Sequence, residues 1–325
     1  MNKIKAGIIG LGRIASLYEK DGKARKYYPY LTHAGTYAKH PGIELICGAD
    51  VNKHKLVEFR KMWGVRNLYT DYRKMLRENE IDILSICTCP DKHYEIIKSA
   101  LGFVKAIFCE KPFTRSSNEV RKIIKLKNKK RQKIAINLYR EYDKSHKRVK
   151  NIIKSGLLGK VQRVNCYYGK GLRNMGTHLL AYLLGIFGIP EKVKVLGKKR
   201  FKDIREFTYD VYFEFNKIPV MMQGCDFNKF RLFEMDFICE KGRIQILDEG
   251  LSIKTFKTAK NKAETGAYEL IERNPLKSSV GSALRGAAEH LIELCKSEKE
   301  PLVSPEKYLD LQLLIEKIEK QGERV

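Results

Sequence analysis

The stretch Gly7-Ile8-Ile9-Gly10-Leu11-Gly12-Arg13-Ile14-Ala15 decides the fold, because it joins an apolar strand pattern to a glycine-rich turn and then a helical pattern. It contains the spacing G-x-G-x-x-A, with small residues at Gly10, Gly12 and Ala15. Gly10 permits a tight turn, Gly12 lets the backbone approach a pyrophosphate, and Ala15 lets the helix pack closely on the sheet. The helix N-terminus then faces the phosphates. The alternative, an ordinary glycine-rich strand–helix turn, is disfavoured by the alternating pattern that follows.

Strand and helix patterns alternate through the first third of the chain. Short apolar runs predict buried strands at 4–9, 44–49, 83–88, 106–109 and 133–138. Helical patterns separate them, at 53–63, 72–78, 93–100 and 117–127. This alternation predicts right-handed crossovers and an α/β domain over residues 1–140, with a doubly wound parallel sheet of the Rossmann type.

The pattern changes after about residue 140. Helices are predicted near 149–157 and 176–187, and two more at 283–296 and 305–320. Consecutive strands with short turns are predicted near 161–168, 206–216, 219–226, 232–240, 242–248 and 251–256. Such a succession favours an antiparallel sheet, so we expect an α+β domain over residues 141–325 with a large, mostly antiparallel open sheet.

Composition excludes several classes of protein. Of the 325 residues, 43% are apolar, which is enough for a full core and excludes wholesale disorder. No apolar run approaches the roughly 20 residues of a membrane span, and the first residues lack the pattern of a secretory signal. We therefore expect a soluble, cytoplasmic protein. The eight cysteines form no C-x-x-C pair, so reduced, mostly buried thiols are favoured over disulfides or zinc, and no metal site is expected.

The chain carries a formal net charge of +26, which attracts polyanions. Residues 121–133 hold eight basic side chains and no acid. Apolar residues lie within this run at near-helical spacing, so a solvated helix face is favoured over a nucleic-acid site. A lysine-rich bias of the whole proteome would explain the charge equally well.

Asp50 is expected to end the second strand and to hold the ribose hydroxyls of the cofactor. A carboxylate there accepts from the 2′-hydroxyl and repels a 2′-phosphate, which favours NAD over NADP. Lys53 and Lys55 lie close by and leave NADP open.

Asp50 also lies farther from Gly12 than the usual spacing of roughly 20 residues. The extra length falls at 18–31, which carries four basic residues and, after Tyr18, three further tyrosines. We interpret it as a loop inserted in or after the first helix, which either contacts an anionic substrate or is a solvated surface excursion.

Four further motifs together resemble the glucose–fructose oxidoreductase / inositol dehydrogenase (Gfo/Idh/MocA) family. They are Thr88-Cys89-Pro90-Asp91-Lys92-His93, Glu110-Lys111-Pro112, Asn137-Leu138-Tyr139-Arg140 and Gly171-Leu172-Arg173-Asn174-Met175-Gly176-Thr177-His178. In this order they are specific, and the resemblance covers nearly the whole chain. It implies reversible hydride transfer between a nicotinamide and a hydroxyl-bearing carbon of a sugar, cyclitol or nucleotide-sugar. It also implies a homodimer or homotetramer formed through the second domain's sheet.

The resemblance assigns roles to individual residues. Lys111 would stabilise the developing negative charge on the reacting oxygen, and His178 would be the general base in oxidation. Asn174 stands where the family commonly has Asp, and we expect it and Arg140, together with Lys111, to bind the substrate. The cofactor-binding residues would be Gly10, Gly12, Arg13, Ile14, Asp50, Thr88, Pro90, His93, Glu110 and Lys111. In this family the bond before Pro112 is often cis.

Each assignment has a structural alternative. Lys111 could be a surface lysine, His178 a helix-face histidine satisfied by the backbone, Arg140 part of a surface salt bridge, and His93 a helix-start histidine without a ligand. For the whole protein, a non-catalytic regulator that binds a dinucleotide on the same fold is the alternative to the enzyme. Loss of the acid at Asn174 favours the regulator, whereas Lys111 and His178 favour the enzyme.

Overall fold

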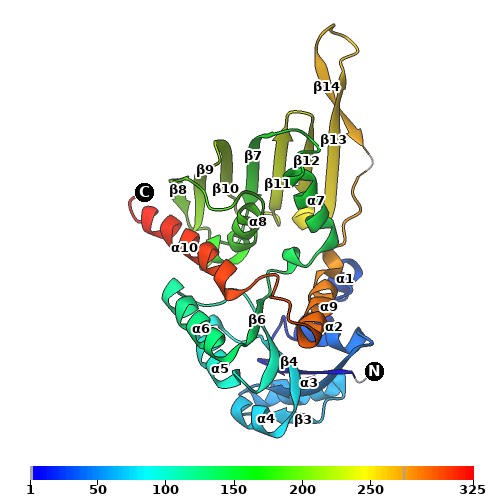
Figure 1. Ribbon diagram of the computed structural model, residues 1–325, viewed down its shortest axis with the longest axis vertical. Coiled ribbons are helices and arrows are strands. Elements are labelled where there is room, and N and C mark those ends of the chain that lie inside the picture. Colours follow the sequence, from blue (N-terminus) through cyan, green and yellow to red (C-terminus); the bar gives the residue numbers. More distant parts are fainter. Residues whose placement is uncertain (1–2, 274) are drawn as a thin grey trace. The chain divides into compact units, whose positions relative to one another are not determined.

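A six-stranded parallel sheet forms the first half of the computed structural model, which describes residues 3–273 and 275–325 (Figure 1). Its order is β3-β2-β1-β4-β5-β6, so the direction of winding reverses between β1 and β4. The strands are β1 (Ile4–Ile9), β2 (Ile43–Ala49), β3 (Asn67–Tyr69), β4 (Ile81–Ile86), β5 (Val104–Cys109) and β6 (Lys133–Ile136). The predicted doubly wound sheet is confirmed, and its reversal point is where such sheets bind ligands.

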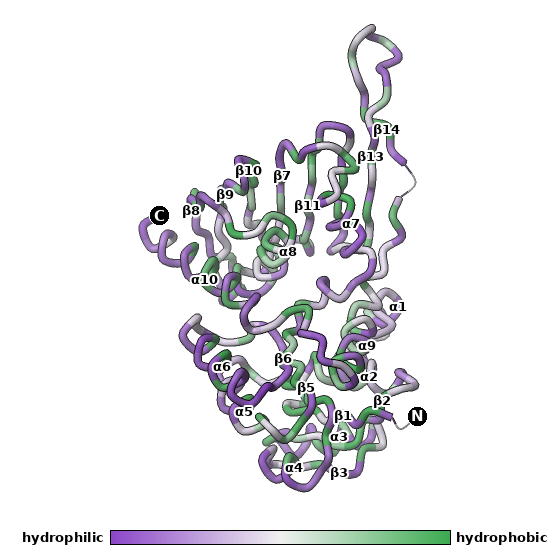
Figure 2. Tube along the Cα trace, viewed as in Figure 1, coloured by the Kyte–Doolittle hydropathy of each residue, from purple (hydrophilic) through white to green (hydrophobic). Residues whose placement is uncertain are grey.

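Helices connect these strands. They are α1 (Gly22–Tyr27), α2 (His33–Lys39), α3 (Lys53–Trp63), α4 (Tyr72–Glu78), α5 (His93–Ala100) and α6 (Ser117–Lys130). Local sequence fixes their ends: the Asn52 side chain caps α3, Ser116 caps α6, and Gly64 ends α3 in the left-handed conformation. Figure 2 shows the apolar character of the strands against the mixed polarity of α6, in which Val120 and Ile123 are buried.

An insertion interrupts the helix expected after the glycine turn. A single turn follows Gly12, and a 3-10 turn, η1 (Leu17–Lys20), comes before α1. The backbone N–H groups of His33 and Ala34 then donate to the carbonyls of Ile14 and Ala15, at 3.2 and 2.9 Å. The helix thus resumes at α2, and the loop predicted at 18–31 lies inside it.

The chain divides into two units. Unit 1 comprises the described residues up to Asp143 together with Gly281–Leu309, and unit 2 comprises Lys144–Val280 and Asp310–Val325, apart from the undescribed position 274. The helix α9 (Ala283–Lys296) therefore belongs to the same unit as the parallel sheet. A single domain boundary at residue 140, as expected from the sequence, would have placed this helix in the second domain. Polar contacts explain this, because Lys133 Nζ donates to the Leu294 carbonyl at 2.9 Å and Ile136 N–H to the Val303 carbonyl at 2.9 Å.

Unit 2 contains an eight-stranded sheet in the order β14-β13-β12-β11-β7-β10-β9-β8. Its strands are β7 (Val161–Tyr168), β8 (Lys192–Lys199), β9 (Thr208–Phe215), β10 (Ile218–Gly224), β11 (Phe233–Cys239), β12 (Gly242–Leu247), β13 (Ser252–Lys260) and β14 (Tyr268–Arg273). Only the pair β7–β10 is parallel among the pairings of these described strands, so the predicted mostly antiparallel sheet is confirmed. Figure 1 shows the β13–β14 hairpin extending beyond its neighbours.

Three further helices are α7 (Lys144–Lys154), α8 (Thr177–Phe187) and α10 (Pro305–Gln321), the last belonging to unit 2 from Asp310 onward. Tyr182 of α8 donates its hydroxyl to the His146 carbonyl of α7 at 3.1 Å. Among the helices in the described part of the chain, none is both long enough and apolar enough to cross a membrane. All eight cysteines are free thiols; Cys47, Cys109, Cys166 and Cys239 are buried.

We predict that Gly286→Ala destabilises unit 1 although alanine favours helices. A Cβ at Gly286, inside α9, would lie 2.5 Å from the Tyr142 carbonyl oxygen. This clash should cost about 1–3 kcal/mol, more than the roughly 1 kcal/mol that helix propensity returns. Urea unfolding measures the difference. Gly22→Ala is the control, since a Cβ there meets nothing within 4 Å; equal stabilisation by both variants would contradict the packing of α9.

Candidate functional site

The glycine turn lies at the carboxyl end of β1, against the end of β4. Gly10 has φ = 85°, and a Cβ there would lie 2.8 Å from the Thr88 amide nitrogen. Only glycine satisfies both the positive φ and this close approach. At Gly12 a Cβ would meet nothing within 4 Å, so this side of the turn is open. The Arg13 guanidinium is exposed and lies 4.5 Å from the centroid of the Tyr18 ring.

Asp50 follows β2 and is fixed against the glycine turn. Its Oδ2 accepts from the Leu11 N–H at 2.8 Å, and its Oδ1 accepts from the Asn52 N–H at 2.9 Å. Lys55 Nζ contacts Oδ2 at 3.3 Å. The carboxylate therefore sits beside the turn, as a ribose-binding acid requires, and Lys55 is its ion-pair partner.

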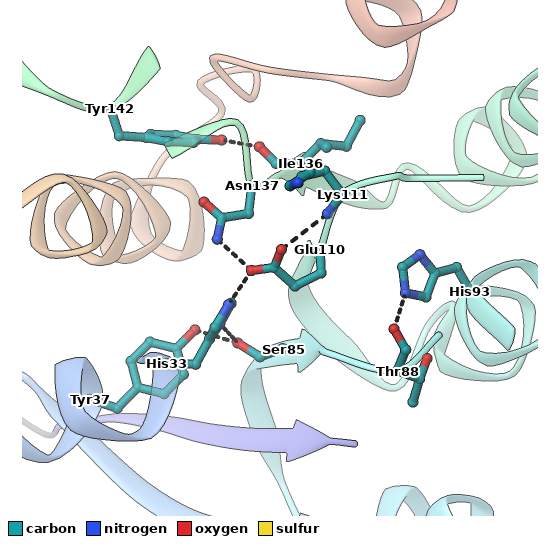
Figure 3. A network of polar contacts seen from close by, with 10 residues as sticks. All are labelled: His33, Tyr37, Ser85, Thr88, His93, Glu110, Lys111, Ile136, Asn137 and Tyr142. Carbon is teal, nitrogen blue, oxygen red and sulfur yellow. Dashed lines mark hydrogen bonds and ion pairs between the residues drawn. The ribbon is translucent and has the colours of Figure 1, made fainter. Parts of the chain in front are cut away.

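The segment after β4 carries Thr88, Pro90 and His93. Thr88 Oγ1 is buried and has no hydrogen-bond partner among the described residues. Pro90 begins a 3-10 turn, η2 (Pro90–Lys92). His93 is fully buried, and its two ring nitrogens contact the carbonyl oxygens of Phe113 and Thr88, each at 3.0 Å. Figure 3 shows the contact with Thr88.

Both ring nitrogens of His93 face backbone carbonyls, so the imidazole links the loop after β4 to the loop after β5. The cofactor-binding role of His93 stays a prediction. Burial lowers the pKa of His93, and its contacts with the two carbonyls oppose this effect only in part.

Glu110 and Lys111 follow β5, at the centre of a buried polar network (Figure 3). Glu110 Oε1 accepts from His33 Nε2 at 2.8 Å and from Asn137 Nδ2 at 2.6 Å. Its Oε2 accepts from the Lys111 backbone N–H at 3.2 Å. The Lys111–Pro112 bond is cis. The Glu110 carboxylate binds protein donors and holds its neighbours in place, and its contact with the cofactor stays a prediction.

The charge state of Glu110 follows from this network. Burial raises the pKa of its carboxyl, but hydrogen bonds from His33 and Asn137 and the charges of His33 and Lys111 outweigh burial, so the pKa lies below its ordinary value. Glu110 is therefore ionised at neutral pH. His33 carries no sequence signal of its own, because it stands just after the insertion and outside every motif.

Arg140 lies in a 3-10 turn, η3 (Tyr139–Glu141), that follows β6. Its side chain is only 2% exposed, and its guanidinium lies 4.6 Å from the centroid of the Tyr139 ring. Burial rules out the surface salt bridge that was the alternative.

In unit 2, Asn174 and His178 lie on either side of a change in helix geometry. Asn174 belongs to a π-helical turn, η4 (Leu172–Gly176), and His178 is a buried residue of α8. Arg173 anchors this turn through two hydrogen bonds to the Glu319 carboxylate, at 2.7 and 2.6 Å. Such π-helical turns are frequent at functional sites. The sequence predicted the helix but not this preceding turn.

The geometry of unit 1 fits a bound dinucleotide. The open side of Gly12 leaves room for a pyrophosphate, and Asp50 supplies an acceptor for ribose hydroxyls. Thr88 Oγ1 is a buried polar atom that has no hydrogen-bond partner among the described residues. No group of His, Cys, Asp and Glu side chains within 3–273 and 275–325 could hold a metal ion. The fold and this edge of the sheet define a dinucleotide-binding domain.

A protein-family model matches the first domain of the chain. Residues 4–138 match the Gfo/Idh/MocA model, described as "Oxidoreductase family, NAD-binding Rossmann fold". Unit 1 therefore carries the NAD-binding domain of this oxidoreductase family, as the motifs indicated.

Individual relatives agree with this identification. Myo-inositol 2-dehydrogenase from Thermotoga maritima is 25% identical over 157 residues, which are 48% of this chain and 42% of that protein. The chain spans about half the length of the curated relatives it matches.

Solved structures share the fold over almost the whole chain. An oxidoreductase from Agrobacterium radiobacter, in complex with NAD+, L-tartaric acid and magnesium, has a TM-score of 0.78 at 14% identity, covering 99% of this chain and 97% of that one. Apo scyllo-inositol dehydrogenase from Lactobacillus casei has a TM-score of 0.75 at 18% identity, covering 99% and 97%. At these identities the similarity supports the fold of both units.

We predict that Gly10→Ala and Gly12→Ala fail in different ways. Gly10→Ala forces a Cβ against the Thr88 backbone at a positive φ, so it should lower the melting temperature of the protein without ligand. Gly12→Ala should leave that temperature unchanged and weaken NADH binding at least tenfold, because the new methyl group occupies the open side of the turn. Thermal melting and titration of NADH fluorescence measure the two effects; equal destabilisation by both variants would contradict this turn geometry.

Proposed function

We propose that the protein is an NAD-preferring oxidoreductase that transfers a hydride between nicotinamide and a hydroxyl-bearing carbon of a sugar, cyclitol or nucleotide-sugar. One observation carries this proposal: at the end of β5, the buried and ionised carboxylate of Glu110 accepts a hydrogen bond from the backbone N–H of Lys111. Two strands along the same sheet, Gly10 makes the turn that receives a dinucleotide. The inositol dehydrogenases among the relatives support a cyclitol or sugar as the substrate class.

NAD, when bound, accepts the hydride in oxidation and returns it in reduction. We assign to Lys111 the stabilisation of negative charge on the substrate oxygen, since an ammonium group favours an alkoxide-like transition state. We assign to His178 the uptake of the hydroxyl proton in oxidation and its return in reduction, because an imidazole titrates near neutral pH.

The remaining assignments follow the same logic. Asn174 keeps the hydrogen bonds of the family's usual Asp but not its charge, so it positions a substrate hydroxyl and cannot raise the pKa of His178. Arg140 is proposed to bind substrate from its buried turn. Asp50 favours NAD, since its carboxylate repels a 2′-phosphate. We also propose that the sheet of unit 2 joins subunits into a homodimer or homotetramer.

Lys111→Met should lower kcat by about 10²–10³-fold, as expected when a charge-stabilising group is lost. His178→Asn should remove the pH dependence near neutrality, since its ordinary pKa is about 6.5. Single-turnover absorbance at the reduced-nicotinamide band, with a panel of sugars and cyclitols, measures both. Lys105→Met is the matched control on the same strand, because Lys105 pairs with Asp82 and is assigned no role in catalysis. NADH binding without turnover of any substrate would instead favour the non-catalytic regulator.

The inserted segment is proposed to contact an anionic part of the substrate. Residues Arg25, Lys26 and Lys39 line a hollow of about 430 Å³ together with Tyr30, and this set carries no acid. Deleting residues 22–28 should raise the KM for an acidic or nucleotide-linked substrate at least fivefold and leave that of a neutral cyclitol unchanged. Steady-state kinetics with both substrate types makes the comparison, and an unchanged KM for the acidic substrate would reduce the segment to a surface excursion.

A further inference from the structure

Of the two polar atoms of the Asn137 side chain, only Nδ2 has a hydrogen-bond partner among the described residues. Its Nδ2 donates to Glu110 Oε1 at 2.6 Å, and because an ionised carboxylate accepts only, this bond fixes which end of the amide is the donor. Its Oδ1 is buried and has no hydrogen-bond partner among the described residues. A buried acceptor without a donor costs about 1–3 kcal/mol. Such an atom calls for a functional explanation.

A second chain of contacts reaches the same carboxylate from α2. His33 Nε2 lies 2.8 Å from Glu110 Oε1, and His33 Nδ1 lies 2.9 Å from Ser85 Oγ. Ser85 Oγ lies 2.6 Å from the Tyr37 hydroxyl. Since the ionised carboxylate must accept, Nε2 carries a proton. The Ser85 hydroxyl lies between His33 Nδ1 and the Tyr37 hydroxyl, so all three side chains are linked to the Glu110 carboxylate.

Burial makes this arrangement rigid. His33 is 1% exposed, Ser85 is fully buried, and Glu110 is 7% exposed. With Oε1 held by His33 and Asn137, Oε2 is directed to the Lys111 N–H. One carboxylate thus fixes both the Asn137 amide and the backbone of the proposed catalytic lysine.

We propose that Asn137 is a ligand-binding residue whose Oδ1 accepts a hydrogen bond from an N–H or O–H group of the bound ligand, and that His33 and Glu110 are positioning residues that keep it turned that way. This inference rests on the proposed function. The donor is either the carboxamide of the nicotinamide or a hydroxyl of the substrate, and the two sources are separable by measurement.

The first test compares His33→Leu, His33→Gln and Asn137→Leu in the whole 325-residue chain. Asn137→Leu removes the acceptor and should weaken NADH binding at least tenfold if the carboxamide is the donor, or raise the substrate KM equally if a hydroxyl is. His33→Leu should reproduce the same defect. His33→Gln keeps an N–H for Glu110 and should restore binding to within about threefold of the wild type.

The control is Gln132→Leu, a buried amide of the same unit. Its Nε2 donates to the Val104 and Lys105 carbonyls at 3.0 and 3.1 Å, and its Oε1 accepts from the Gly102 N–H at 3.1 Å. It should lower the melting temperature without changing NADH affinity or KM. If Asn137→Leu behaves like this control while the wild type turns over substrate, the assignment of Asn137 is wrong. A wild type that neither binds NADH nor turns over substrate contradicts the proposed function instead.

A double-mutant cycle tests the positioning role of His33. In the His33→Leu variant, the Asn137 amide is no longer held in place. Adding Asn137→Leu to this variant should therefore cause less than half of the affinity loss that Asn137→Leu causes in the wild type. Fully additive losses would mean that the two residues act separately and would overturn the proposal for His33.

The pH dependence of melting provides a readout that needs no ligand. The pKa of Glu110 is lowered in the folded protein. The ionised carboxylate therefore stabilises the fold at pH values above the ordinary pKa of a glutamate, and this stabilisation is lost as the pH falls through the lowered pKa. In His33→Leu burial dominates and raises this pKa, so the loss should begin at a higher pH than in the wild type. The other titratable groups facing Glu110 are Lys111, Tyr37, Cys87, Cys109 and His93. Coincident melting profiles would contradict the stabilisation of ionised Glu110 by the hydrogen bond from His33.

Discussion

The carboxyl edge of the parallel sheet depends on the hydrogen bonds that the buried, ionised carboxylate of Glu110 accepts. A buried charge is tolerated only when several donors replace its hydration, and here they come from α2, from the end of β6 and from the next peptide of the chain. Each donor lies on a different element, so one side chain ties together segments that are distant in sequence. The backbone N–H of Lys111 is one of these donors, so the network and the start of the Lys111 loop are joined directly.

The two glycines of the glycine turn have different roles. Gly10 is required by the backbone of the neighbouring strand end, whereas Gly12 is required by nothing in the protein itself. The first glycine therefore serves the fold and the second leaves room for a ligand. His93 similarly serves the fold, because its ring joins the loop after β4 to the loop after β5. Both loops flank the strand ends at which a dinucleotide is received.

The sequence predicted most of the elements, because apolar periodicity is strong wherever a strand or helix has a buried face. It missed β8 and β14 for the opposite reason: β8 is rich in lysine, and β14 is almost wholly exposed. It placed the β-strands of unit 2 in chain order, whereas β7 lies between β10 and β11, a pairing over long sequence separation that no local pattern encodes. At the site, the motifs singled out Glu110 and Lys111, which lie directly after β5. His33 was invisible, since only the folded chain brings α2 onto β5.

The way in which α2 resumes the first helix has an evolutionary consequence. Because the N–H groups of His33 and Ala34 donate to the carbonyls of Ile14 and Ala15, two backbone hydrogen bonds hold the ends of the intervening segment together. The entropy of closing a loop rises slowly with its length, so a change in the length of this segment costs little loop-closure entropy. The phosphate-binding turn would be unaffected by such changes. This place in the chain is accordingly suited to grafting a foreign peptide, and natural variation in recognition can accumulate there while the chemistry stays the same.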